Sequence, residues 1–145
     1  MPSHIVDIWD KALQEMLKDS GVSIRQAAVE GLAQVAGGLY PLIAPWIGAL
    51  GAFMTGSNTN SNVVFALLQV RTAQLLGYTV AVILAGQTAG AGLASVVAPA
   101  KIVVGTSTAD LAGREGEVMR KMLPYILFLV VLTSLLTLIG LSFKL

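Results

Sequence analysis

A dense polar run lies between two almost wholly apolar segments: Thr55-Gly56-Ser57-Asn58-Thr59-Asn60-Ser61-Asn62. The flanking segments, 39–54 and 63–105, contain only two charged residues, Arg71 and Lys101. Such a run is either a loop in water whose Asn and Ser residues cap helices, or a polar site held inside a lipid bilayer. The choice between the two determines how the flanking segments fold.

The composition is typical of a membrane protein. Hydrophobic residues make up 55% of the chain and charged residues 12%, about half the charged share of soluble domains. The net charge of +1, without a basic stripe, excludes nucleic acid as a partner. The chain has no cysteine and one histidine, His4, so we expect no disulfide, no thiolate catalysis, no metal site and no cofactor. The polar, acidic N-terminus does not have the pattern of a signal peptide.

The first 36 residues are predicted to form an amphipathic helical segment. From Ile5 to Leu17 apolar residues recur at helical spacing, with charged residues on the other face, which predicts a helix lying on the membrane or packed on other helices. A second, weaker helix is predicted from Ser23 to about Ala36, ending at Gly37-Gly38. Residues 37–145 are then predicted to be the membrane region.

Arm lengths favour a bilayer site for the polar run. The best turn after it is Gly77-Tyr78-Thr79, which leaves an arm from Asn62 to Leu76. That arm has about 15 residues and a length of roughly 22 Å, against a hydrocarbon core about 30 Å thick. The arm before the run, from about Leu39, is similarly short and contains two prolines. Two short arms joined by a polar tip predict a re-entrant helical hairpin with its tip near the middle of the bilayer.

A broken transmembrane helix is predicted to follow the hairpin. The segment from Tyr78 to Val104 is long enough to span, but Gln87-Thr88-Ala89-Gly90-Ala91-Gly92 interrupts it about 10 to 14 residues in. Irregular backbone at that depth is tolerated only where it is buried in protein or lines a cavity. The chain therefore offers two polar interruptions that reach the same level of the membrane.

The end of the chain predicts one complete span. A polar loop from Gly105 to Lys121 precedes Pro124, which is expected to open an apolar helix through about Phe143. The basic residues of that loop predict a cytoplasmic loop and an external C-terminus. The predicted fold class is thus an all-α, multi-pass membrane protein with amphipathic N-terminal helices, a re-entrant hairpin, a broken helix and one full C-terminal transmembrane helix.

Four motifs resemble the C-terminal part of the L-lactate permease family. They are the polar run at 55–62, the Gln-Thr-Gly segment at 87–92, Ala98-Pro99-Ala100-Lys101-Ile102, and Gly113-Arg114-Glu115-Gly116-Glu117. The resemblance covers about Leu32 to Leu145, and its most specific motif is the polar run. Members of the family are several times longer, so the resemblance implies that this chain corresponds to the last portion of a permease. Ser57-Asn58-Thr59 is also similar to the Ser-Asn-Thr hairpin motif of a wider ion-transporter group built from inverted repeats.

The resemblance implies secondary active transport and no enzyme activity. The expected substrate is lactate or a related short 2-hydroxy acid anion such as glycolate, with a proton as the coupling ion and sodium as the alternative. The expected location is the plasma membrane, the inner membrane of a prokaryote. The expected partners are the lipid bilayer and either the missing N-terminal permease half or further copies of this chain.

The polar run has the chemistry that a small carboxylate needs. A half-helix that begins around Asn60 to Val63 presents free backbone N–H groups and the positive end of its dipole to an anion. Arg71 and Lys101 are predicted to extend to the membrane interfaces instead of binding substrate. The predicted substrate-binding residues are Gly56, Ser57, Asn58, Thr59, Asn60, Ser61, Asn62, Gln87, Thr88, Gly90 and Gly92.

Two other function classes stay open at this point. A small standalone membrane subunit with a structural or assembly role is the main alternative, because one hairpin and one broken helix make only half of a site. An intramembrane enzyme is less well supported, because the apolar region has no Ser-His, Asp-Asp or metal-binding constellation.

Overall fold

The computed structural model describes residue 24 and residues 26–142, and this part of the chain consists of helices joined by short turns. The prediction of an all-α membrane protein is confirmed. The predicted helix from Ile5 to Leu17 lies outside the described residues. In chain order, helical residues 26–36 are followed by η1 (Gly37–Leu39), α2 (Tyr40–Thr55), α3 (Asn58–Leu76), α4 (Val80–Ser95), α5 (Pro99–Thr108) and α6 (Glu115–Ser142).

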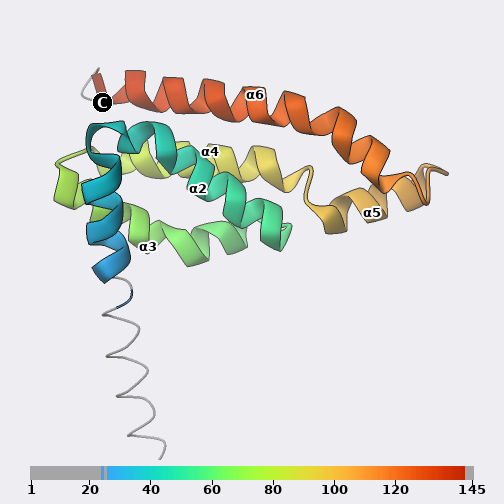
Figure 1. The fold of residues 1–145 in the computed structure, drawn as a ribbon, viewed down its shortest axis with the longest axis horizontal. Coiled ribbons are helices and arrows are strands. Elements are labelled where there is room, and N and C mark those ends of the chain that lie inside the picture. Colours follow the sequence, from blue (N-terminus) through green and yellow to red (C-terminus); the bar gives the residue numbers. More distant parts are fainter. Residues whose placement is uncertain (1–23, 25, 143–145) are drawn as a thin grey trace, which may run out of the picture.

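Four helices form one elongated bundle (Figure 1). Helices α2 and α3 make an antiparallel hairpin, and α4 packs on both, most extensively on α2. Helix α5 continues beyond the hairpin tip, and α6 returns along α4 and α2. Helical residues 26–36 stand across the opposite end of the bundle, turned sharply from α2 at η1. The hairpin tip and the end of α4 therefore lie at the same end of the bundle.

Within the described residues, two helices are long and apolar enough to cross a membrane, and a bent pair can supply a third span. They are Gln26–Thr55, with 30 residues, and Glu115–Ser142, with 28. The bent pair is α4 with α5, which meet at 40°. Helix α2 alone has 16 residues, as short as its predicted arm, but it is continued backwards through η1. The predicted break at Gly37-Gly38 is one turn of 3-10 helix with Gly37 at φ 45°, and the helical chain changes direction there between residues 26–36 and α2 (Figure 1).

The last helix begins earlier than predicted. Helix α6 starts at Glu115, so Pro124 lies inside it, and the connection from α5 covers only residues 109–114 instead of a loop from Gly105 to Lys121. The acidic side chains of Glu115 and Glu117 explain this early start, because negative charge in a first turn stabilises the positive end of the helix dipole.

The hairpin tip is shorter than predicted. Of the polar run at 55–62, only Gly56 and Ser57 are outside the helices. Helix α3 begins at Asn58, whereas the predicted start was around Asn60 to Val63. Gly56 adopts the left-handed conformation, with φ 70°, and Ser57 caps α3 by accepting a hydrogen bond from the backbone N–H of Asn60 at 3.2 Å. This cap lets the helix begin inside the polar run. The predicted turn at Gly77 is confirmed, with φ 72°.

The predicted break at Gln87–Gly92 is wrong. Helix α4 runs through this segment without interruption, and the break falls at residues 96–98. Pro99 explains its position, because proline lacks a backbone N–H and disfavours helical geometry in the residue before it. The glycines of α4 instead permit close packing: a Cβ atom on Gly90 would lie 2.1 Å from the backbone oxygen of Pro45 in α2.

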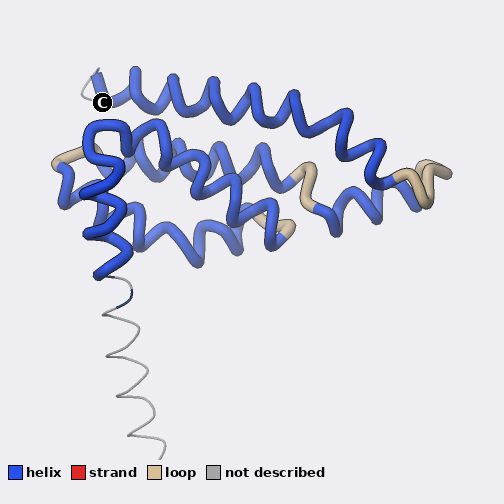
Figure 2. The backbone as a smooth tube through the Cα atoms, viewed as in Figure 1, coloured by secondary structure: helices blue, strands red, loops and turns tan. Residues whose placement is uncertain are grey.

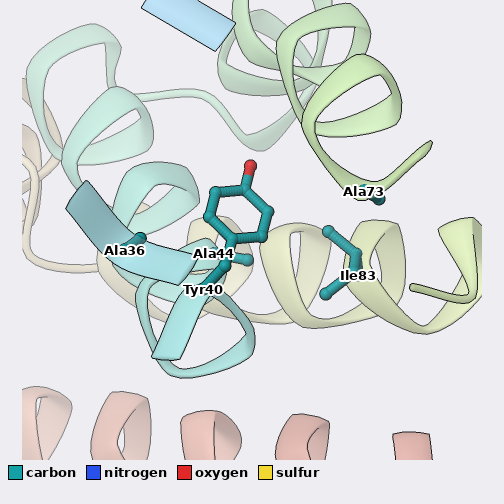
Figure 3. Packing of buried hydrophobic residues seen from close by; sticks show 5 residues of the cluster. All are labelled: Ala36, Tyr40, Ala44, Ala73 and Ile83. Atoms are coloured by element: carbon teal, nitrogen blue, oxygen red, sulfur yellow. The ribbon is translucent and has the colours of Figure 1, made fainter. Parts of the chain in front are cut away.

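A buried polar pair holds the hairpin together at the end away from its tip. Tyr40 lies in a cluster with Ala36, Ala44, Ala73 and Ile83, which come from three helices and residues 26–36 (Figure 3). The Tyr40 hydroxyl donates to Gln69 Oε1 at 2.5 Å, and Gln69 Nε2 donates to the backbone oxygen of Ala44 at 3.2 Å. Both side chains are fully buried, so the pair fixes the register of α2 against α3.

Replacing Tyr40 with phenylalanine is expected to destabilise the fold by about 1–3 kcal/mol, because Gln69 Oε1 loses its donor in a buried site. Unfolding of the detergent-solubilised chain, followed by circular dichroism, measures this change. Tyr125→Phe on α6 is the matched control, since that tyrosine is 74% exposed, and it is expected to leave stability unchanged. Equal stability of the two variants would contradict the assigned hydrogen bond.

Helix α6 presents apolar side chains on most of its surface. Only Val130, Ser134 and Thr137 are buried, on the stripe that faces α2 and α4. The exposed apolar side chains include Phe128, Val131, Leu132, Leu135, Leu136 and Ile139. A continuous apolar surface of this kind is suited to lipid and supports the assignment to membrane proteins.

Candidate functional site

The hairpin tip and the break between α4 and α5 lie against each other. Both appear as short tan segments close together in Figure 2, and a Cβ atom on Gly56 would lie 3.9 Å from Cβ of Ala98. Helix α3 begins at the tip and α5 begins at the break, so two helix N-termini meet here. We call this place the tip–break junction, formed by residues 56–58 and 96–101.

The first turn of α3 keeps backbone donors available. The side-chain oxygen of Ser57 accepts a hydrogen bond from the N–H of Asn60, and its backbone oxygen accepts one from the N–H of Ser61. Within the described residues, the N–H groups of Asn58 and Thr59 make no hydrogen bond. These two donors, together with the partial positive charge of a helix N-terminus, form a favourable position for an anion.

Asn62 connects α3 to α4 through a cluster of amides. Its Nδ2 donates to Asn58 Oδ1 at 3.2 Å, and its Oδ1 accepts from Gln87 Nε2 at 3.3 Å and from Thr88 Oγ1 at 3.4 Å. Gln87 is fully buried, and its Oε1 has no hydrogen-bond partner. A buried acceptor without a donor is unfavourable, and this oxygen is the one buried side-chain nitrogen or oxygen atom of the described residues that is left without a hydrogen-bond partner.

Ser95 and Lys101 form the other wall of the junction. Asn58 Nδ2 lies 3.8 Å from the position of a Cβ on Gly92. Ser95 Oγ donates to the backbone oxygen of the same glycine at 2.9 Å, and Lys101 Nζ donates to Ser95 Oγ at 3.2 Å. Lys101 was predicted to extend to a membrane interface and Ser95 was not among the predicted site residues, whereas in the structure the two are hydrogen-bonded to each other beside Gly92. The signal that locates them is Pro99, which ends α4 and places Lys101 in the first turn of α5.

The predicted site residues divide into three groups. The first group lies at or beside the junction and consists of Gly56, Ser57, Asn58, Asn62 and Gly92. Gln87 and Thr88 belong to this group because their side chains donate hydrogen bonds to Asn62. The side chains of Thr59 and Asn60 are exposed and make no hydrogen bond within the described residues. Ser61 and Gly90 belong to the interface with α2 instead: Ser61 Oγ donates to the backbone oxygen of Gly48 at 2.8 Å, and Gly90 packs on Pro45.

A cavity of about 810 Å³ lies away from the junction. It separates helical residues 26–36 from the outer face of α3, and its walls are mostly apolar, with Glu30 and Arg71 among them. No residue of the amide cluster lines it. A small hydroxy acid needs several converging hydrogen-bond donors and acceptors, and these converge at the junction.

The fold and site define the class of this protein: an all-helical membrane protein in which the N-termini of interrupted helices meet at a polar site, as they do in secondary transporters. The chain belongs to the L-lactate permease family, whose sequence model matches residues 6–143. The named relatives of this family are permeases, which are transport proteins and not enzymes.

Similar proteins agree on the family. The chain is 33% identical over 97 residues to a "Putative L-lactate permease" of Haemophilus influenzae, covering 66% of this chain and 18% of that protein. It is 32% identical over 103 residues to the "Glycolate permease GlcA" of Escherichia coli, covering 71% and 18%. It is 33% identical over 101 residues to the "L-lactate permease" of Halalkalibacterium halodurans, covering 70% and 19%. The chain thus spans less than a fifth of these relatives, and no solved structure matches it.

Proposed function

We propose that this chain contributes half of the substrate site of a transporter for lactate and related short 2-hydroxy acids, such as glycolate, in the plasma membrane. The observation that carries the proposal is the meeting of the hairpin tip with the helix break beside the Asn62 amide cluster. The names of its relatives, which are L-lactate and glycolate permeases, support the substrate class.

The chemistry of the junction suits a hydroxy acid. A carboxylate placed at the start of α3 receives hydrogen bonds from the N–H groups of Asn58 and Thr59, and the helix dipole stabilises its charge. The amides of Asn62 and Gln87 offer acceptors and donors to a 2-hydroxyl group. No Asp or Glu lies between Glu30 and Asp110, so no acidic side chain of this segment repels the anion.

Transport requires more than this half-site. In the proposal the second half comes from the remaining permease helices or from another copy of this chain, and the two halves enclose the substrate near the bilayer midplane. The proposed coupling ion is a proton, with sodium as the alternative. Since residues 31–109 contain no carboxylate, a coupling carboxylate has to come from outside this segment.

Asn58→Ala is the test of the proposed site. The variant removes the amide that bonds to Asn62 and borders Gly92, and lactate binding to the chain in lipid nanodiscs is expected to weaken at least about tenfold. Equilibrium binding of radiolabelled lactate measures the effect, and membrane insertion is expected to stay unchanged.

Gln74→Ala is the matched control, because Gln74 is an exposed amide on the same helix, far from its N-terminus. It is expected to bind lactate as the unchanged chain does. The proposed function is contradicted if lactate binds neither to the unchanged chain nor to the chain assembled with the remaining permease helices that supply the second half of the site. The assigned site is contradicted if Asn58→Ala binds lactate as tightly as Gln74→Ala.

A further inference from the structure

We infer that the Lys101 ammonium is the counter-charge that holds the substrate carboxylate at the tip–break junction, with Ser95 as its positioning residue. The inference rests on the proposed function and adds to it a charged residue and a reason for selecting acids. A neutral analogue of the same shape lacks the carboxylate and gains nothing from this contact.

The position of Lys101 carries the first part of the inference. Its Nζ lies 3.2 Å from Ser95 Oγ, which in turn donates to the backbone oxygen of Gly92. Asn58 Nδ2 approaches the same glycine, at 3.8 Å from its Cβ position. Asn58 thus borders Gly92 directly from the start of α3, and Lys101, at the start of α5, is linked to the same glycine through Ser95.

The charge of Lys101 has no acidic partner within the described residues. Both ion pairs found there involve Glu117, which pairs with Arg114 and Lys121. Charged side chains in apolar segments of membrane proteins generally pair with another charge or mark a substrate pathway. Lys101 is exposed at the break, so its ammonium is accessible to an anion that enters there.

An independent feature of the site also indicates a ligand. Gln87 is fully buried and directs its amide toward the cluster that begins at Asn58, yet its Oε1 receives no hydrogen bond. The Lys101 ammonium has no anionic partner within the described residues, and Gln87 Oε1 has no donor. A ligand with a carboxylate and a hydroxyl group offers a partner to each, with the carboxylate toward Lys101 and the hydroxyl toward the amide cluster. A 2-hydroxy acid has both groups on adjacent carbon atoms.

The cavity of about 270 Å³ that Lys101 lines is a separate space between the break, α5 and the start of α6, because none of its lining residues comes from the hairpin tip or the amide cluster. The ligand position inferred here therefore lies on the side of the lysine that faces Ser95. Arg71, the other cation of the apolar region, is less suitable. It lies 13 positions after Asn58 on the same helix, roughly 20 Å along the axis, and it lines the separate cavity beside residues 26–36.

The experiment compares lactate with lactamide, its uncharged amide, by equilibrium and competition binding to the chain in nanodiscs. The unchanged chain is expected to prefer lactate. Lys101→Gln is expected to weaken lactate binding about 10- to 100-fold, the loss typical of a hydrogen bond to a charged group, while lactamide binding changes less than about twofold. Lys101→Arg is expected to retain part of the preference, because it keeps the charge.

The supporting variants separate charge from structure. Ser95→Ala is expected to reduce the preference for lactate a few-fold, because the ammonium loses its fixed position. Lys121→Gln is the matched control, since this lysine pairs with Glu117 on the surface of α6 and is 73% exposed. It is expected to bind both ligands as the unchanged chain does.

Two results overturn the inference while the proposed function stands. Lactate binding by Lys101→Gln as tight as that of the unchanged chain excludes Lys101 as the counter-charge. An equal loss of lactate and lactamide binding by this variant shows a structural role only. A different result, in which neither the unchanged chain nor its assembly with the remaining permease helices binds either ligand, overturns the proposed function and the inference together.

Discussion

Replacing Gly90 with alanine is expected to prevent α2 and α4 from packing as they do in this structure. The new Cβ would lie 2.1 Å from the backbone oxygen of Pro45 and 2.8 Å from its carbonyl carbon. These are backbone atoms of a helix, so they cannot rotate away as the end of a side chain can. Overpacking of a core commonly costs about 1–3 kcal/mol, and we expect a loss of at least about 3 kcal/mol here. Unfolding in detergent, followed by circular dichroism, measures it.

Gly105→Ala is the matched control for this substitution. Gly105 lies within α5, and a Cβ atom there meets no atom within 4 Å. Because alanine is the better helix former, this change is expected to leave stability equal or to raise it by up to about 1 kcal/mol. If Gly90→Ala is as stable as Gly105→Ala, α2 and α4 do not pack on each other through Gly90.

Replacing Gly92 with leucine is expected to abolish lactate binding while the helices still pack. A Cβ on Gly92 makes only ordinary contact with Asn58 Nδ2, at 3.8 Å, so Gly92→Ala fits without strain. The longer leucine side chain occupies the space between Asn58 and the Ser95–Lys101 pair. We expect binding to weaken at least about 100-fold, since an anion at this place loses its hydrogen-bonding partners.

The measurement for Gly92→Leu is radiolabelled lactate binding in nanodiscs, with thermal unfolding of the same samples as the test of folding. Gly116→Leu is the control, because a Cβ at Gly116 meets no atom within 4 Å, and it is expected to bind normally. Normal lactate binding by a folded Gly92→Leu variant would place the substrate elsewhere.

Much of the fold was predictable from short stretches of sequence. The turn at Gly77 between α3 and α4 and the apolar final helix were predicted correctly, because a left-handed glycine and a long apolar run act on the backbone locally. The predicted starting residues of α3 and α6 were less accurate. The Ser57 cap and the acidic turn at Glu115 lengthen α3 and α6 beyond the predicted bounds, because capping interactions outweigh the low helix propensity of Asn and Gly.

The break in the second polar segment could not be located from composition. Glycine is a poor helix former, so 87–92 was the expected break, but glycine is also the residue that lets two helix backbones approach closely. Contact with α2 keeps Gly90 helical, and Pro99 ends the helix further on. Because the helix break lies at 96–98 and not at 87–92, Lys101 falls in the first turn of α5, beside Ser95. The spacing of residues along the chain did not reveal this contact.

The sequence alone determined the class of protein and the family to which it belongs. These depend on local hydropathy and on motifs that need no spatial arrangement. Only the tertiary structure decided which polar residues meet: Asn58, Asn62 and Gln87 join across two helices, while Ser61 bonds to the backbone of α2. The reason is physical. Helix packing selects which face of each helix is enclosed, and residues next to each other in the polar run point to different neighbours.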